Sequence, residues 1–195
     1  MIEQRSGDGC APLQRLLLGH DGTLTELIGA LMQEPLGLVK LEHRVATADA
    51  PIPVLELEAG DPLIQRRVLL RGSRSGTVYV HADAHLAAAR LPAALRDALE
   101  QTDIPLGRLM RQHRLEVFQE PLGWQCREAA ALATRFPDCR DDDRVIFRRY
   151  RAFSGGRPAL LIDESFSPLL WRLLAGELRA IDLPLRPDSR PACAA

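Results

Sequence analysis

The chain lacks the features that mark several large classes of protein. Its 25 lysines and arginines are balanced by 26 aspartates and glutamates, for a formal net charge of −1 over 195 residues, whereas a DNA-binding domain usually carries a clear basic excess. No apolar run approaches the roughly 18 residues that a membrane span needs. Residues 1–12 are polar and lack the basic start and apolar stretch of a secretory signal. We therefore expect a cytoplasmic protein that binds neither nucleic acid nor membrane.

Short motifs for nucleotides, hydrolysis or disulfides are missing as well. The sequence contains no P-loop, no G-x-G-x-x-G and no G-x-S-x-G, so nothing supports a nucleotide-binding or hydrolase class. No C-x-x-C spacing occurs either. We interpret the four cysteines as reduced thiols without a metal or disulfide role: Cys10, Cys126, Cys139 and Cys193.

One segment has a spacing that a metal site can use. In the run from His81 to His85, alternate positions place both histidines and Asp83 on one side of a strand. No further ligand with recognisable spacing accompanies them, and we expect the segment to straddle the end of a strand. We therefore predict no metal.

What is present is the composition of one soluble globular domain, with 46% hydrophobic and 26% charged residues. A chain of this length can bury a core and enclose a small ligand. We predict a flexible N-terminus at 1–12, a single domain at 13–183 and a disordered, proline-rich tail at 184–195. We expect a monomer or a weak dimer.

The local patterns predict strands in hairpin pairs with helices between them. Glycine-rich segments at 72–76 and 154–157 separate alternating runs, as in β-hairpins. Thr23 and Glu26 have capping-box spacing, which predicts a helix start. Since no β-α-β rhythm occurs, the pattern favours an α+β domain built on an antiparallel sheet. The predicted strands are 36–46, 64–70, 77–81, 115–119, 145–153 and 159–166; the predicted helices are 24–32, 86–99, 103–110, 128–134 and 169–181, and 12–18 is a short helix or strand.

Two opposite charges stand at strand positions where apolar residues are expected. Period-two alternation puts Arg66 on the face of Ile64 and Val68, and Glu164 on the face of Leu160. A fold keeps buried charges only when they are paired or serve a ligand, because an unpaired one is costly. The first hypothesis is a closed polar pocket. The alternatives are a structural ion pair between the two residues, or a one-residue shift at a bulge that turns both to solvent.

Other segments supply further groups that can bind an anion. Leu106 and Gly107 follow Pro105 at a predicted helix start, where free backbone N–H groups can bind a carboxylate, although most helix starts bind nothing. Three arginines cluster on one predicted strand, with Arg149 and Arg151 on one face and Arg148 on the other. Such a cluster is typical of a solvated face, and the alternative is that it steers an anionic ligand.

These residues occur in the order found in chorismate pyruvate-lyases. The chain resembles that family over residues 16–170, and it is more similar to the branch that supplies 4-hydroxybenzoate for specialised metabolites or glycolipids than to the ubiquinone-pathway branch. The segments that carry the resemblance are Gly22-Thr23-Leu24-Thr25, Arg66 in an Arg-x-Val-Leu-Leu strand, Pro105-Leu106-Gly107, Arg148-Arg149-Tyr150-Arg151, Ser154-Gly155-Gly156-Arg157-Pro158, and Glu164 before Phe166.

The resemblance implies a single α+β domain with a six-stranded antiparallel sheet and a ligand site sealed under flaps. It implies a lyase that converts chorismate to 4-hydroxybenzoate and pyruvate without a cofactor. Arg66 is then the residue that binds the ring carboxylate, the backbone N–H of Leu106 is the second carboxylate contact, and Glu164 is the acidic residue at the far end of the ring. Arg66 and Glu164 are the implied catalytic residues.

Three further residues complete the predicted binding set. Leu24 falls near the family's flap position, Gly107 lies beside Leu106, and Arg149 comes from the arginine cluster. The sequence departs from many relatives at Asp163, where they often have threonine. Alternation points Asp163 away from Glu164, so we expect it to have little effect on the pocket.

Two other functions compete with this interpretation. The first is a non-catalytic protein that binds an aromatic acid, because ligand-sensing domains of some bacterial transcription regulators resemble the same fold. Such regulators place a basic helix-turn-helix domain ahead of the sensor, and we expect none here. The second is a lyase that acts on a related enolpyruvyl compound such as isochorismate or aminodeoxychorismate.

Overall fold

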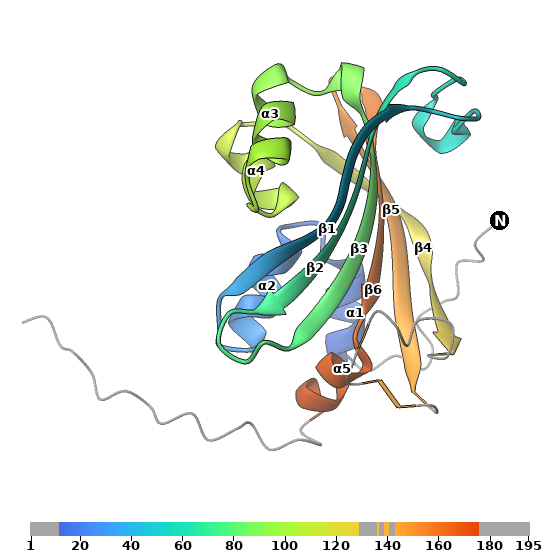
Figure 1. The fold of residues 1–195 in the computed structure, drawn as a ribbon. Coiled ribbons are helices and arrows are strands. Elements are labelled where there is room, and N and C mark those ends of the chain that lie inside the picture. The colour runs from blue at the N-terminus through green and yellow to red at the C-terminus, as the bar shows by residue number, and fades with distance from the viewer. Residues whose placement is uncertain (1–11, 129–135, 137–138, 141–142, 176–195) are drawn as a thin grey trace, which may run out of the picture.

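A single antiparallel sheet forms the centre of the molecule (Figure 1). The computed structural model describes residues 12–128, 136, 139–140 and 143–175. The strands are arranged in the order β1-β2-β3-β6-β5-β4. Their bounds are β1 Leu36–Thr47, β2 Pro62–Gly72, β3 Val78–Ala87, β4 Phe118–Glu128, β5 Arg144–Ser154 and β6 Arg157–Phe166. The predicted α+β class with a six-stranded antiparallel sheet is confirmed.

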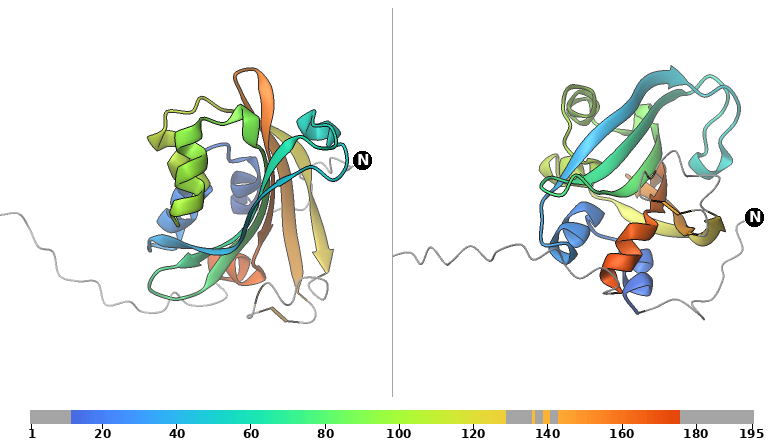
Figure 2. Two further views of the ribbon diagram at one scale, coloured as in Figure 1. Left: turned by 45° about the horizontal axis from the view of Figure 1, so that its top comes forward. Right: turned by 60° about the horizontal axis from the view of Figure 1, so that its bottom comes forward.

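The helices cover one face of this sheet. Figure 2 shows α3 and α4 standing off one end of that face, with α2 beyond them. The helices are α1 Pro12–Gly19, α2 Leu24–Leu31, α3 Ala93–Gln101, α4 Leu106–Gln112 and α5 Pro168–Leu174, with single 3₁₀ turns η1 Pro53–Leu55 and η2 Ala88–Arg90. No helix among the described residues is long and apolar enough to cross a membrane.

Several predicted element bounds were wrong. The strand predicted at 77–81 continues to Ala87, so the segment from His81 to His85 lies inside β3. The helix predicted at 86–99 begins only at Ala93, because Leu86 and Ala87 belong to β3 and Ala88–Arg90 forms the 3₁₀ turn η2. The strand predicted at 115–119 begins at Phe118 and runs on to Glu128. The helix predicted at 128–134 falls almost wholly outside the described residues, as does the end of the one predicted at 169–181.

The start of α2 was predicted correctly, but the capping box predicted from Thr23 and Glu26 does not form. Thr23 is the N-cap, and its carbonyl accepts the first helical bonds, yet its side chain makes no capping hydrogen bond. Glu26 instead forms an ion pair with Arg111 of α4. The pair joins the two helices that begin on either side of the pocket described below.

The covered face of the sheet carries two apolar clusters. One fills the space under α3 and α4 and includes Leu86, Leu109 and Leu160. The other lies against α1, α2 and α5 and includes Ile28 and Phe166. Between them, β2, β6 and β5 each place a buried charge on the covered face: Arg66 is 4% exposed, Glu164 6% and Arg148 5%. A polar layer therefore separates two hydrophobic cores.

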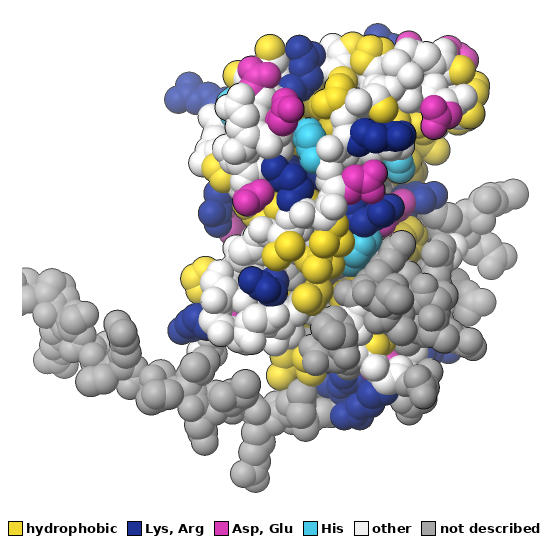
Figure 3. All heavy atoms as spheres, viewed as in Figure 1, with side chains coloured by type: hydrophobic (Ala, Val, Ile, Leu, Met, Phe, Trp, Pro, Cys, Tyr) yellow, Lys and Arg dark blue, Asp and Glu magenta, His cyan; other side chains and the backbone are white. Residues whose placement is uncertain are grey.

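The opposite face of the sheet carries two smaller apolar clusters and, between them, charged side chains that pair with one another. Glu42, Arg67 and Asp83 form a cross-strand chain of ion pairs at 3.1 and 2.7 Å. Farther along the sheet, Arg149 pairs with Asp163 at 2.5 Å. Figure 3 shows basic and acidic side chains lying close together over the strands. The near-equal numbers of acidic and basic residues, 26 and 25, make such pairing possible.

A buried glutamate fastens the turn between β2 and β3. Glu34 accepts hydrogen bonds from the backbone N–H groups of Arg74 and Ser75 and from the hydroxyls of Ser75 and Tyr79, at 2.6 to 3.1 Å. Burial raises the pKa of Glu34, but these donors outweigh it and hold the pKa at about 2. The site ties the end of α2 to the hairpin.

Candidate functional site

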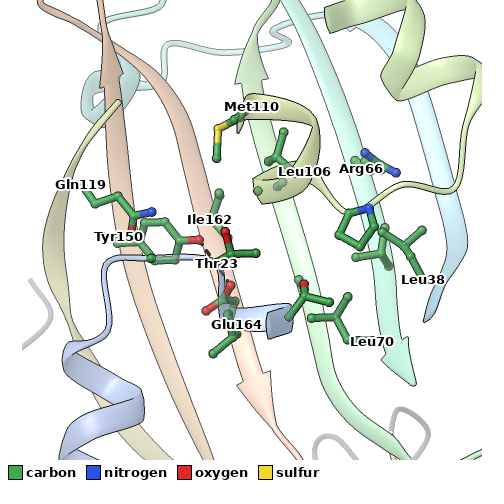
Figure 4. Close-up of a pocket in the computed structure, with 18 residues that line it drawn as sticks. Thr23, Leu38, Arg66, Leu70, Leu106, Met110, Gln119, Tyr150, Ile162 and Glu164 are labelled. Carbon is green, nitrogen blue, oxygen red and sulfur yellow. Dashed lines mark hydrogen bonds between the residues drawn. The ribbon is translucent and has the colours of Figure 1, made fainter. Parts of the chain in front are cut away.

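A pocket opens within the polar layer, between the sheet and the start of α4. Its walls come from all six strands, from the segment that begins α2 and from α4. Ala82 and Ala84 of β3 line its floor, where larger side chains would fill it. The enclosed space measures about 80 Å³, several times the room that one water needs. Figure 4 shows Arg66 and Glu164 on opposite sides of it.

Arg66 is a buried charge without a matching anion in direct contact. Its Nη2 donates one long hydrogen bond of 3.4 Å to the carbonyl of Ile104. Its Nε and Nη1 have no hydrogen-bond partner among the described residues. Burial lowers the pKa of Arg66, and the nearby Asp103 partly opposes this effect, but a guanidinium stays charged. Arg66 therefore has two donors available for a bound anion.

The strand neighbour of Arg66 does not neutralise it either. His43 lies opposite Arg66 in the β1–β2 register, and both of its ring nitrogens are buried without partners. Burial lowers the pKa of His43, and the charges of Arg66 and Lys40 lower it further. His43 thus stays neutral beside the guanidinium, and sequence patterns gave no sign of it.

Glu164 is held from two sides. The Nε of Arg148 donates to its Oε2 at 2.6 Å, and the hydroxyl of Tyr150 donates to its Oε1 at 3.3 Å (Figure 4). Burial lowers the pKa of Arg148, but Glu164 and Tyr150 together outweigh it and raise this pKa. The alternative of an ion pair between Arg66 and Glu164 was thus wrong, because Glu164 pairs with Arg148.

Arg148 also fixes the end of α1. Its Nη1 donates to the carbonyls of Leu17 and His20 at 2.7 and 2.9 Å, at the end of the helix where unsatisfied carbonyls and the negative pole of the helix dipole lie. A guanidinium bound to these carbonyls has little freedom to turn. Arg148 therefore holds Glu164 in a fixed position at the edge of the pocket.

The pocket brings together most of the predicted site residues. Arg66, Glu164, Leu24, Leu106 and Gly107 all line it. Leu106 and Gly107 are the first residues of α4, and the first backbone N–H groups of a helix have no partner within it. A Cβ on Gly107 would come within 3.3 Å of Thr23, so the turn before α2 packs closely on the start of α4.

Arg149 does not belong with them. Its side chain points to the opposite face of the sheet and forms a bidentate ion pair with Asp163, with hydrogen bonds of 2.5 and 2.6 Å. The prediction that Arg149 binds the ligand was wrong in placement, because alternation on β5 puts its neighbours Arg148 and Tyr150 on the covered face instead. Asp163 points away from Glu164, as predicted.

His81, Asp83 and His85, the three residues with metal-site spacing, do not line the pocket. His81 is buried on the other face, with its Nδ1 3.5 Å from Asp83. The described residues contain no group of three histidine, cysteine, aspartate or glutamate side chains that could hold a metal ion. Cys126 and Cys139 are free thiols, and Cys10 and Cys193 lie outside the described residues.

Three pocket residues escaped the sequence prediction as functional groups. Tyr150 was read only as part of a motif, Thr23 only as a helix cap, and Gln119 was not singled out, yet all three line the end of the pocket near Glu164. The signal for Tyr150 was its position two residues from Arg148, which puts both on one face of the strand.

Comparison with known proteins gives one family and one fold. A family model described as "Chorismate pyruvate-lyase Rv2949c-like" matches residues 17–174. The chorismate pyruvate-lyase of Mycobacterium leprae (strain TN) is 27% identical over 152 residues, which are 78% of this chain and 72% of that protein. The chorismate pyruvate-lyase of Mycobacterium tuberculosis (strain ATCC 25618 / H37Rv) is 27% identical over 162 residues, or 81% of each chain.

Solved structures with this fold include domains of transcription regulators. The effector domain of PhnF from Mycobacterium smegmatis superimposes with a TM-score of 0.58 at 16% identity, over 74% of this chain and 88% of that one. A GntR-family transcriptional regulator from Bacillus cereus gives a TM-score of 0.53 at 14% identity, over 69% and 92%. At these identities the likeness shows a shared fold alone.

Proposed function

The chain belongs to the Rv2949c-like family of chorismate pyruvate-lyases, and we propose that it converts chorismate to 4-hydroxybenzoate and pyruvate. The observation that carries this proposal is Arg66, a buried guanidinium that lines the pocket and has two donors without partners among the described residues. A fold tolerates such a group when a ligand supplies the missing anion. The ring carboxylate of chorismate is an anion of the right shape for two guanidinium donors.

The spacing of the two charged ends suits a single ring. β3 lies between β2 and β6 in the sheet, and Arg66 is level with Ile162, two residues before Glu164, so the backbones of Arg66 and Glu164 are roughly 12 Å apart. Their side chains lean into the pocket from its two sides. A six-membered ring with its carboxylate at Arg66 directs the opposite ring position toward Glu164. In this orientation the backbone N–H of Leu106 is the second carboxylate contact, and Leu24 and Gly107 close over the ring.

The reaction needs positioning and proton handling. The ether bond between the ring and the enolpyruvyl group breaks, and its electron pair leaves with the ether oxygen. One ring hydrogen leaves as a proton, the ring becomes aromatic, and a proton added to the enolpyruvate carbon gives pyruvate, with no net oxidation or reduction. Glu164 is placed to take or hold a proton at the ring hydroxyl or the leaving ether. Arg66 holds the substrate in a water-poor space, where electrostatic contacts are strong.

The test is turnover of chorismate by the purified protein. We expect 4-hydroxybenzoate and pyruvate in equal amounts, measured by chromatography and by coupled reduction of pyruvate. Arg149→Ala serves as a control, because it removes an arginine from the same motif on the opposite face of the sheet. Product masses with isochorismate and aminodeoxychorismate identify the preferred enolpyruvyl compound. Absence of pyruvate release from all three compounds rules out the lyase.

The fold supports one other function, namely the binding of an aromatic acid without turnover. The similarity to effector domains of transcription regulators favours it, and the same pocket would serve, with Arg66 on the carboxylate. Binding of 4-hydroxybenzoate that raises the melting temperature, with no pyruvate released from chorismate over a day, identifies this function.

A further inference from the structure

Tyr150 is a polar residue of the pocket with no role in the proposed reaction, and it contacts Glu164 directly. It is one of only two tyrosines in the chain. Its ring lines the pocket, and its hydroxyl lies 3.3 Å from Oε1 of Glu164. Hydrogen bonds between two oxygens are usually 2.5 to 3.0 Å long. The contact is therefore loose, and a ligand oxygen that enters beside it can take the hydrogen of Tyr150.

The charge at this end of the pocket is already balanced. Arg148 binds the other oxygen of Glu164 at 2.6 Å and is itself buried. The pair carries no net charge, and Arg148 is committed to the carbonyls at the end of α1. A cationic group brought here would add an uncompensated charge to a buried site, which is costly. A neutral group that both donates and accepts a hydrogen bond would satisfy Glu164 and Tyr150 together.

We infer that Tyr150 is a specificity-determining residue: with Glu164 it selects a ring hydroxyl over a ring amine at the position opposite the carboxylate. This inference rests on the proposed function for its orientation of the ring. The ligand hydroxyl donates to Glu164, which is an acceptor only, and it accepts from Tyr150. An aromatic amine donates in the same way but accepts poorly, and an aliphatic ammonium accepts nothing. The enzyme should thus favour chorismate over its 4-amino analogue.

The protonation state of Tyr150 agrees with this role. Burial raises the pKa of Tyr150 well above its ordinary value, and the neighbouring Glu164 carboxylate raises it further, while Arg148 lowers it by less. The hydroxyl keeps its proton throughout the physiological range, so it remains a donor. The charged and titratable groups against it are Arg148 and Glu164.

The second tyrosine provides a matched control. Tyr79 is also buried and also donates to a buried glutamate, Glu34, at 2.7 Å, but it lies outside the pocket. Tyr79→Phe and Tyr150→Phe each delete one hydroxyl from a buried tyrosine–glutamate contact. Only the second deletion removes a group that faces the ligand.

The experiment measures the affinities of 4-hydroxybenzoate, 4-aminobenzoate and benzoate by calorimetry for the wild type and both variants. In the wild type we expect 4-hydroxybenzoate to bind about tenfold more tightly than either of the others, as for one well-made buried hydrogen bond. Tyr150→Phe should reduce this preference to about threefold or less and leave the affinity for benzoate within about threefold, which also reports an intact pocket. Tyr79→Phe should keep the full preference.

The outcomes separate this inference from the proposed function. A full preference for 4-hydroxybenzoate in Tyr150→Phe overturns the inference and assigns the selection to Thr23 or Gln119, the other polar residues at this end. If that variant also turns over chorismate, the lyase proposal stands alone. If the preference for 4-hydroxybenzoate depends on Tyr150 but the wild type does not turn over chorismate, the lyase proposal fails and the inference that Tyr150 selects the ring hydroxyl remains. A wild type that binds none of the three compounds overturns both.

Discussion

Replacing Arg66 with methionine should separate ligand binding from folding. Methionine has a similar length and is apolar, and the site it would enter lies between two hydrophobic cores. Arg66 has one long hydrogen bond of 3.4 Å and two unpartnered donors in a position that is 4% exposed. The folded protein therefore pays for an uncompensated buried charge. We expect Arg66→Met to raise the free energy of unfolding by about 1 kcal/mol or more, and the melting temperature by about 2–4 °C per kcal/mol.

The same substitution should abolish most of the activity. Removing one partner of a buried, charge-assisted contact with a ligand costs about 2–5 kcal/mol, so kcat/KM for chorismate should fall by about 10²-fold or more. Addition of 4-hydroxybenzoate should raise the melting temperature of the wild type and leave that of Arg66→Met unchanged. The two measurements are scanning calorimetry and product formation on the same preparations.

Arg148→Met is the matched control, because Arg148 is equally buried but paired. Its removal leaves Glu164 as an unpaired buried carboxylate and frees the carbonyls of α1. Breaking a buried pair in this way costs about 3–5 kcal/mol, so the melting temperature should fall by about 6 °C or more. If Arg66→Met were destabilised as strongly as Arg148→Met, Arg66 would have a structural partner and the ligand-binding role would be refuted.

The remaining predictions concern three other carboxylate or arginine sites. The pKa of Glu34 is about 2 in the folded protein against 4.5 ordinarily, so Glu34 contributes about 3 kcal/mol of stability above pH 4.5, and this contribution is lost as the pH falls toward 2. Urea unfolding should therefore find Glu34→Gln destabilised at pH 7 and nearly as stable as the wild type at pH 2. A difference in stability that persists at pH 2 would show that it does not come from the ionised carboxylate. Arg149→Ala breaks only the partly buried pair with Asp163, so stability should fall by about 1 kcal/mol and turnover should stay within twofold; a large loss of turnover would return Arg149 to the site. Glu164→Gln should lower kcat by about 10²-fold or more, and unchanged turnover would remove Glu164 from the mechanism.

The fold could be predicted largely because its strands have one apolar face. On β2 burial largely alternates, whereas β6 is buried on both faces over most of its length; on both strands, counting by two from the apolar residues correctly gave the inward direction of Arg66 and Glu164. The turn between β5 and β6 could also be predicted from its two glycines, because Gly155 and Gly156 adopt the positive φ angles of 58° and 75° that a tight hairpin needs. Strand β4 was misplaced because Pro121 and Gly123 interrupt its pattern. It lies at the edge of the sheet with an irregularity at that point, where both residues are tolerated.

The partner of Glu164 could not be predicted, because it depends on a bulge. The turn sets Ser154 opposite Arg157, and a regular ladder from there would place Arg148 opposite Asp163. The register instead shifts by one residue between Ala152 and Phe153, so that Arg148 lies opposite Glu164. A one-residue shift changes the partner of every residue beyond it, and no residue type in this segment predicts such a shift. The choice of Arg149 as the pocket arginine failed for a related reason: three arginines in four positions look alike until the register is known.

The polar layer also explains why two buried arginines, so close in the fold, have different roles. Arg148 has its carboxylate and its helix carbonyls within the protein, so its charge is satisfied whether or not a ligand is bound. Arg66 lies across β3, where Ala82 and Ala84 leave space that no side chain fills. Longer apolar residues on β3 would join the two hydrophobic cores and remove the pocket, with a gain in buried area. The molecule instead keeps an unfilled space beside an unsatisfied charge, and under the proposed function an anionic ring would stabilise this combination by occupying it.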